Sequence, residues 1–144
     1  MSQTGHILRT AQDLLNQHGL LSSDLGNFAD NEGRLDITAA IYRAATGETP
    51  NSFINDPKDA RRLIEANEAV VTAVRWVSAV LPTQPPHDPD SGIDDHIEHL
   101  AYWLLEPDIF LGRYLNTSDV IGVLGRAADA ADNVTDIPQQ RPAA

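Results

Sequence analysis

Apolar residues recur along most of the chain at the spacing of helices that bury one face. The clearest case is residues 34–47, RLDITAAIYRAATG, where the apolar positions at offsets 0, 3, 4, 7 and 8 are Ile37, Ala40, Ile41, Ala44 and Ala45. That spacing puts them on one side of a helix. Asp36 stands at the N-cap position, and Gly47 stands where a helix ends through a left-handed residue. The pattern predicts a buried helix between them.

The same spacing predicts further helices at about residues 4–18, 57–81 and 94–105. Another starts after Asn116-Thr117-Ser118 and continues to about residue 132. Asp56-Pro57 is a typical helix start. Residues 57–81 form one long helix or two with a bend near Asn67, where the apolar stripe is weakest. We therefore expect an all-α bundle of five or six helices as a single domain over residues 1–134, followed by a disordered tail at 135–144.

Two longer connections separate these helices. Residues 21–35 contain a strong turn pattern at residues 30–33, DNEG. Residues 82–92 contain Pro82, Pro85, Pro86, Pro89, Asp88 and Asp90. Such a composition favours extended backbone, so we expect an irregular, acidic, Pro-rich loop inside the domain.

Composition narrows the classes of function. The 144 residues carry a net charge of −11 and a pI of about 4.6, and they include no cysteine. Excess negative charge opposes binding to nucleic acid backbones and to anionic membranes. No stretch approaches the ~20 apolar residues of a membrane-spanning helix, and the lack of cysteine fits a reducing compartment. We expect a cytoplasmic protein with neither nucleic acid nor membrane as a direct partner.

One cluster has the residue types of a divalent-metal site. His96 and His99 are three positions apart in the segment DDHIEH, so they share a helix face, and Asp95 is a nearby carboxylate. The spacing is not that of an HExxH motif. Acidic residues are also expected at a helix start, where they cap the helix and oppose its dipole. The sequence favours this capping interpretation over a metal site at His96, His99 and Asp95.

No motif for nucleophilic catalysis, phosphate binding or a cofactor is present, since neither GxSxG nor a phosphate loop occurs. Carboxylates that pair only in the folded chain leave acid–base catalysis open. The basic cluster Lys58, Arg61 and Arg62 is explained by a helical ion pair of Arg61 with Glu65. The sequence does not decide whether the protein is an enzyme, but it favours a non-enzymatic role without a cofactor.

The candidate interaction residues are large and apolar. Trp103 lies beside the apolar stripe of the 94–105 helix, and Ile109, Phe110 and Leu111 follow in a short connection. Apolar residues in such a connection either fill the core or form an exposed partner site. We name these four residues as the candidate site for a protein partner.

The two stretches RLDITAAIYRAATG and GRYLNTSDVIGVLGRAADAAD resemble an actinobacterial family of small helical domains of unknown function that also occurs in phage genomes. Residues 39–45, AAIYRAA, match the small-residue motif of its second helix, and Gly112-Arg113 with residues 117–128 matches the segment that opens its last helix. The family's usual cysteine and glycine are Thr38 and Ala39 here. The resemblance covers about residues 5–131; it implies a helical fold and carries over no active site.

Three functions are compatible with these observations. The leading hypothesis is a small acidic interaction or regulatory protein that binds another protein, with a second copy of the chain as a further partner in a homodimer. The first alternative is a divalent-metal-binding protein or metal-dependent enzyme that uses His96 and His99. The second is an acidic mimic of nucleic acid that inhibits a DNA-binding protein.

Overall fold

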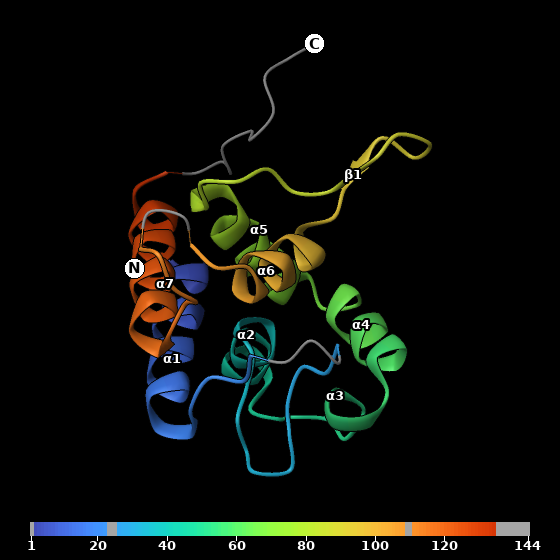
Figure 1. The fold of residues 1–144 in the computed structure, drawn as a ribbon, viewed down its shortest axis with the longest axis vertical. Helices are drawn as coiled ribbons and strands as arrows, with labels where there is room; N and C mark the ends of the chain where they lie inside the picture. The colour runs from blue at the N-terminus through green and yellow to red at the C-terminus, as the bar shows by residue number, and fades with distance from the viewer. Residues whose placement is uncertain (1, 23–25, 109–110, 135–144) are drawn as a thin grey trace.

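Seven α-helices and one short hairpin make up the described part of the chain, residues 2–22, 26–108 and 111–134 of a computed structural model (Figure 1). The helices are α1 Gln3–His18, α2 Ile37–Thr46, α3 Ser52–Asn55, α4 Pro57–Glu65, α5 Glu68–Val80, α6 His96–Leu105 and α7 Thr117–Asn133. Strands β1 His87–Asp88 and β2 Ile93–Asp94 pair antiparallel. The predicted all-α fold is confirmed, and the predicted tail, residues 135–144, lies outside the described residues.

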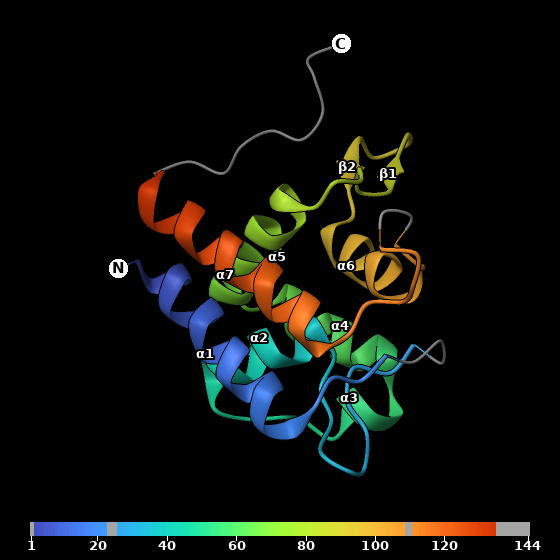
Figure 2. The same cartoon turned by 60° about the vertical axis from the view of Figure 1, so that its left-hand side comes forward.

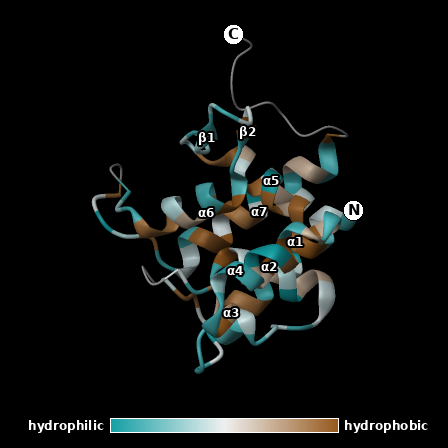
Figure 3. Cartoon of the chain, turned by 90° about the vertical axis from the view of Figure 1, so that its right-hand side faces the viewer, coloured by the Kyte–Doolittle hydropathy of each residue, from teal (hydrophilic) through white to brown (hydrophobic). Residues whose placement is uncertain are grey.

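Helix α5 is at the centre of the bundle and contacts α1, α2, α4, α6 and α7. Figure 2 shows α1 and α7 side by side along one flank, with α6 and the hairpin on the other side of α5. All seven helices contribute hydrophobic residues to one buried core. Figure 3 shows the alternation of hydrophobic and hydrophilic residues along these helices. Trp76 on α5 belongs to this core and is 4% exposed.

Side-chain caps fix the helix starts that the sequence indicates. Asp36, Asp56 and Asn116 each accept a hydrogen bond from a backbone N–H in the first turn of α2, α4 and α7. The last helix begins at Thr117, directly after its cap, rather than after residue 118. Gly47 ends α2 in the left-handed conformation, at φ 82°. In this sequence, therefore, the cap residues are the main indication of where helices begin and end.

The structure also resolves the alternative for residues 57–81. Asn67 has extended φ and ψ angles, and its side chain accepts a hydrogen bond from the Val70 N–H at 3.1 Å. It is therefore the N-cap of a separate helix, so the segment forms two helices, α4 and α5. Together with the four-residue α3, this gives seven helices where the spacing indicated five or six.

The acidic loop differs in detail from the sequence-based expectation. Ile93 and Asp94 pair with His87 and Asp88 in the hairpin, so α6 begins two residues later than the apolar spacing indicates. The N-cap of α6 is Asp95, whose carboxylate accepts a hydrogen bond from the Glu98 N–H at 3.0 Å.

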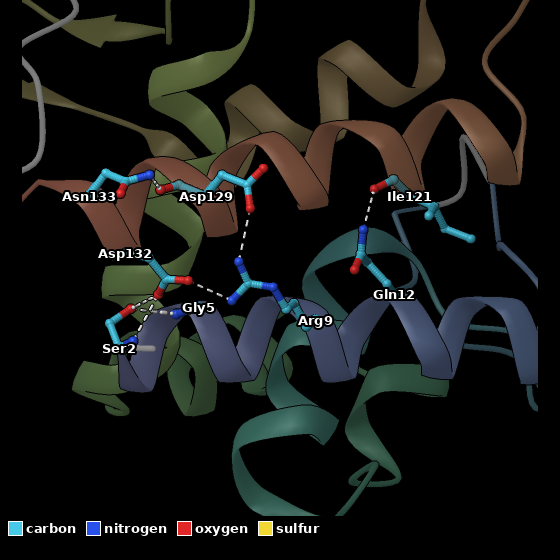
Figure 4. A network of polar contacts seen from close by, with 8 residues as sticks. All are labelled: Ser2, Gly5, Arg9, Gln12, Ile121, Asp129, Asp132 and Asn133. Atoms are coloured by element: carbon cyan, nitrogen blue, oxygen red, sulfur yellow. Dashed lines mark hydrogen bonds and ion pairs between the residues drawn. The ribbon is translucent and has the colours of Figure 1, made fainter.

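Polar contacts join the antiparallel helices α1 and α7 (Figure 4). Asp132 accepts hydrogen bonds from the backbone N–H and the hydroxyl of Ser2, both at 2.8 Å, and pairs with Arg9 at 2.7 Å. The Ser2 and Arg9 donors hold the pKa of Asp132 at about 2. Further along, the Gln12 amide donates to the Ile121 carbonyl at 2.8 Å. These contacts fix how the two helices align.

Candidate functional site

Two histidines of α6 meet one serine of α5 in the interior. The Oγ of Ser78 lies 2.8 Å from Nδ1 of His96 and 2.6 Å from Nδ1 of His99. The other ring nitrogen of His99, Nε2, lies 2.8 Å from Oγ1 of Thr83. Ser78 and His99 are buried, at 0% and 2% exposure. This histidine–serine network joins α6 to α5 and to the segment that follows α5.

The network holds both imidazoles in their neutral form at neutral pH. Burial, and then the neighbouring His96, lower the pKa of His99 to about 4, and burial with the nearby Arg75 lowers the pKa of His96. The single hydroxyl proton of Ser78 can be donated to only one of the two rings. The Nδ1 of the other ring must therefore carry a proton and donate it to Ser78 Oγ.

The structure brings together only part of the metal site named from sequence. His96 and His99 share a face, as their spacing predicts, but their Nδ1 atoms both face the Ser78 hydroxyl. Asp95 instead caps α6 and accepts a hydrogen bond from Arg61 at 2.8 Å. Arg61 also pairs with Glu65 at 2.7 Å, which confirms the predicted helical ion pair. Among residues 2–22, 26–108 and 111–134, no three His, Cys, Asp or Glu side chains are grouped so that they could hold a metal ion.

A pocket of about 550 Å³ lies where α6 ends, and we call it the aromatic pocket. Its walls combine prolines of the 82–86 segment with aromatic and acidic side chains, and the residues that matter below are His99, Tyr102, Trp103, Glu106, Asp108 and Leu115. No lysine or arginine of the described chain lines it. Tyr102 is 53% exposed. A pocket with two aromatic rings, two carboxylates and no cation favours a positively charged group.

Of the candidate interaction residues that the structure describes, Trp103 lines this pocket, and Leu111 is not part of its lining. Leu111 is 49% exposed in the turn that follows Asp108. The N–H of Leu111 donates to the Asp108 carboxylate at 2.9 Å, so the turn is joined to the pocket wall. Ile109 and Phe110 lie outside the described residues.

Sequence reasoning missed a second pocket, of about 400 Å³, which we call the Asp36 pocket. Its apolar walls come from α6 and from the connection before α2, and include Phe28, Ile97 and Leu105. Asp36 contributes the carboxyl group, which also accepts a hydrogen bond from the Ala39 N–H at 2.7 Å. Burial raises the pKa of Asp36 to about 8, against hydrogen bonds from α2 amides that lower it. The sequence marks Asp36 as a cap but carries no sign of the walls.

Comparison with known proteins places the chain in a family. Residues 1–130 match the pattern of a family of unknown function, DUF6197. The chain belongs to this family. No curated protein and no solved structure matches the chain. Membership confirms the resemblance to a family of unknown function, and it supplies no activity.

Among the residues that the structure describes, none of the helices has both the length and the apolar character needed to cross a bilayer. The longest, α7, has 17 residues and carries several charged side chains.

Proposed function

We propose that this member of DUF6197 is a non-enzymatic interaction domain that binds a basic segment of another protein at the aromatic pocket. The observation that carries the proposal is the composition of the pocket, which has the rings of Tyr102 and Trp103, the carboxylates of Glu106 and Asp108, and no lining cation within the described chain.

The electrostatics of the pocket support a cationic occupant. Glu106 is exposed, and no ion pair within the described residues involves it. The nearest arginine in sequence, Arg113, pairs with Asp119 at 2.7 Å and does not line the pocket. It also interacts electrostatically with Asp108, so Glu106 is the carboxylate on which the proposal depends. His99 is neutral at pH 7 because burial lowers its pKa to about 4. A guanidinium or ammonium group would meet negative charge and aromatic rings, each of which attracts it.

The surroundings of the pocket support a protein segment as the occupant. Leu111 and Tyr114, in the connection between α6 and α7, are 49% and 66% exposed. A chain that places a basic side chain in the pocket can place an apolar neighbour against Leu111. The net charge of −11 would also attract a basic partner over a longer range and speed its association.

The proposal is tested with short synthetic peptides. The probe is a capped pentapeptide with a central arginine between two leucines, and its control has citrulline, a neutral isostere, in place of arginine. Binding is measured by fluorescence anisotropy of a labelled peptide. We expect the arginine peptide to bind more tightly than the citrulline peptide, and increasing salt to weaken its binding.

Two variants with the same net charge distinguish binding at the aromatic pocket from attraction of the peptide by the net charge of the protein. Glu106→Gln removes a pocket carboxylate, whereas Glu48→Gln removes an exposed carboxylate in the loop after α2. Losing one partner of a cation costs about 1 kcal/mol, so we expect Glu106→Gln to weaken binding roughly fivefold. Glu48→Gln should bind as the wild type does. Equal effects of the two variants, or equal affinity for the arginine and citrulline peptides, would overturn the proposal.

The remaining expectations concern biological context. We also propose that the family occurs in actinobacteria and in phages, as the resemblance implies. We propose the cytoplasm as the compartment of this protein. A cytoplasmic setting is supported by the absence of cysteine. We favour a partner protein over a homodimer because two copies of an acidic chain repel each other. Light scattering that shows a dimer at micromolar concentration would reverse that preference.

A further inference from the structure

We propose that the Asp36 pocket binds a small organic amine, with the ammonium group against the Asp36 carboxylate and the hydrocarbon part against the apolar walls. This site is separate from the one proposed for the basic segment. The two pockets lie on either side of Tyr102, which lines both.

The shape and lining of the pocket fit a small molecule. Its volume of about 400 Å³ lies in the range of small-ligand sites, ~300–1,000 Å³. The walls are mainly apolar, with Leu21 and Phe28 from the connection before α2 and Ile97, Ala101 and Leu104 from α6. Such walls favour a ligand with a hydrocarbon or aromatic body.

The carboxylate of Asp36 lacks a cationic partner. Its hydrogen bonds from the backbone amides of Ala39 and Thr38 use only part of the accepting capacity of a carboxylate, which has about four lone-pair sites. Within the described residues no arginine, lysine or histidine forms an ion pair with Asp36. A half-buried carboxylate without a cationic partner is costly to ionise, and an ammonium ligand would reduce that cost.

The other charged groups of the pocket do not favour an anionic ligand. Arg61 lines the pocket, but its guanidinium is hydrogen-bonded to Asp95 at 2.8 Å and Glu65 at 2.7 Å. Glu98 adds a second carboxylate to the lining, and Lys58 is an exposed side chain. Arg61 thus already has carboxylate partners, with Glu98 as a third at 3.8 Å, whereas no ion pair within the described residues involves Asp36.

The test uses matched pairs of amines and alcohols on the intact chain. Hexylamine and phenethylamine are compared with hexanol and phenethyl alcohol by isothermal titration calorimetry at pH 7. We expect the amines to bind more tightly than the alcohols. We also expect the release of about one proton per bound amine, because a carboxyl with a pKa of about 8 is mostly protonated at pH 7 and ionises when the ammonium binds. Titration in two buffers of different ionisation enthalpy measures this proton.

The decisive variant is Asp36→Asn, since asparagine caps a helix as well as aspartate does and α2 should remain intact. We expect it to weaken amine binding about tenfold and to abolish the proton release. Asp13→Asn, which changes an exposed carboxylate of α1, and Glu106→Gln, in the aromatic pocket, should leave both unchanged.

Each contrary result overturns the inference on its own. These results are an alcohol that binds as well as its amine, an Asp36→Asn variant with wild-type affinity, and the absence of amine binding to the wild type. Backbone amide shifts in nuclear magnetic resonance spectra give a readout that needs no variant. Amine-induced shifts that cluster at Phe28 and Ala101 support the site, and shifts confined to Trp103 and Glu106 contradict it. The peptide affinity of Glu106→Gln tests the proposal for the aromatic pocket and does not bear on the Asp36 pocket. Each of the two proposals can therefore be refuted without the other.

Discussion

Because His99 is neutral in the folded protein, it should make the free energy of unfolding depend on pH. Substitution of His99 should remove this contribution. The pKa of a histidine is 6.5 in an unperturbed chain and about 4 for His99 in the fold, where the ring is 2% exposed. Between these values the unfolded chain binds a proton that the folded chain does not. The contribution of the neutral ring is therefore complete above pH 6.5 and is lost as the pH falls toward 4. Lowering the pKa from 6.5 to about 4 corresponds to a contribution of about 3 kcal/mol to the free energy of unfolding.

The assay is urea denaturation of the wild type and of His99→Gln at a series of pH values between 7.5 and 4.5. His99→Gln is expected to be less stable than the wild type at pH 7, because the bonds to Ser78 and Thr83 change. The informative quantity is the difference between the two free energies of unfolding as a function of pH. Carboxylates that titrate in the same pH range contribute equally to the free energies of unfolding of both proteins, so their contributions cancel in the difference. We expect that difference to shrink by about 2–3 kcal/mol between pH 7 and pH 4.5.

A matched control and a clear contrary result complete this test. The control is His6→Gln, which changes an exposed histidine of α1 and leaves the bonds of His99 to Ser78 and Thr83 in place. If the free energies of the wild type and His99→Gln run parallel from pH 7.5 to 4.5, His99 is not held neutral by its surroundings. The electrostatic argument for the aromatic pocket would then lose one of its supports.

Three further predictions concern packing, titration and metal binding. A Cβ at Gly5 would collide with the carboxylate of Asp132, which joins α7 to α1, so Gly5→Ala should lower the midpoint of thermal unfolding. A Cβ at Gly122 would meet only the Arg126 side chain, at 3.8 Å, which is an ordinary contact, so Gly122→Ala should raise the midpoint through a gain of about 0.5–1 kcal/mol. The contribution of Asp36 to stability should fall as the pH rises from about 4 to about 8, because folded Asp36 keeps a proton that the unfolded chain releases. In denaturation series, the free energy of unfolding of the wild type relative to Asp36→Asn should therefore fall over this range, and a difference that does not change with pH would contradict it. Zinc, manganese and nickel should give no binding heat in calorimetry, because His96 and His99 already bind a hydroxyl; a saturable heat that disappears in His99→Gln would restore the metal hypothesis.

The helical skeleton could be predicted because its information is local. Asp36, Asp56 and Gly47 act on backbone groups within a few residues of themselves, so their roles follow from the sequence alone. The division at Asn67 was visible as a weak point but not decidable, since an asparagine can occupy the surface of a helix or cap one. The start of α6 was placed too early because the pairing of Asp94 with β1 depends on a hairpin that apolar spacing does not encode.

The candidate site could be predicted only in part because its partners come from distant segments. The spacing of His96 and His99 correctly puts both rings on one face, but nothing near them in sequence indicates that Ser78 meets them. Asp95 caps α6, as the sequence favoured, but its bond to Arg61 could not be predicted because Arg61 lies on another helix. Trp103 was named as an interaction residue from its size, whereas the pocket around it forms only after the chain has folded.

The two tryptophans provide the most direct test of the central claim, that a basic segment binds at the aromatic pocket. Trp103 lines that pocket, and Trp76 is 4% exposed in the core, so their indole N–H signals act as probe and internal control. The measurement is a titration of ¹⁵N-labelled protein with the arginine pentapeptide, followed in ¹H–¹⁵N correlation spectra. The account predicts a saturable shift of the Trp103 indole signal with Trp76 unchanged, and no such shift with the citrulline peptide. An unmoved Trp103 signal at saturating peptide would contradict it.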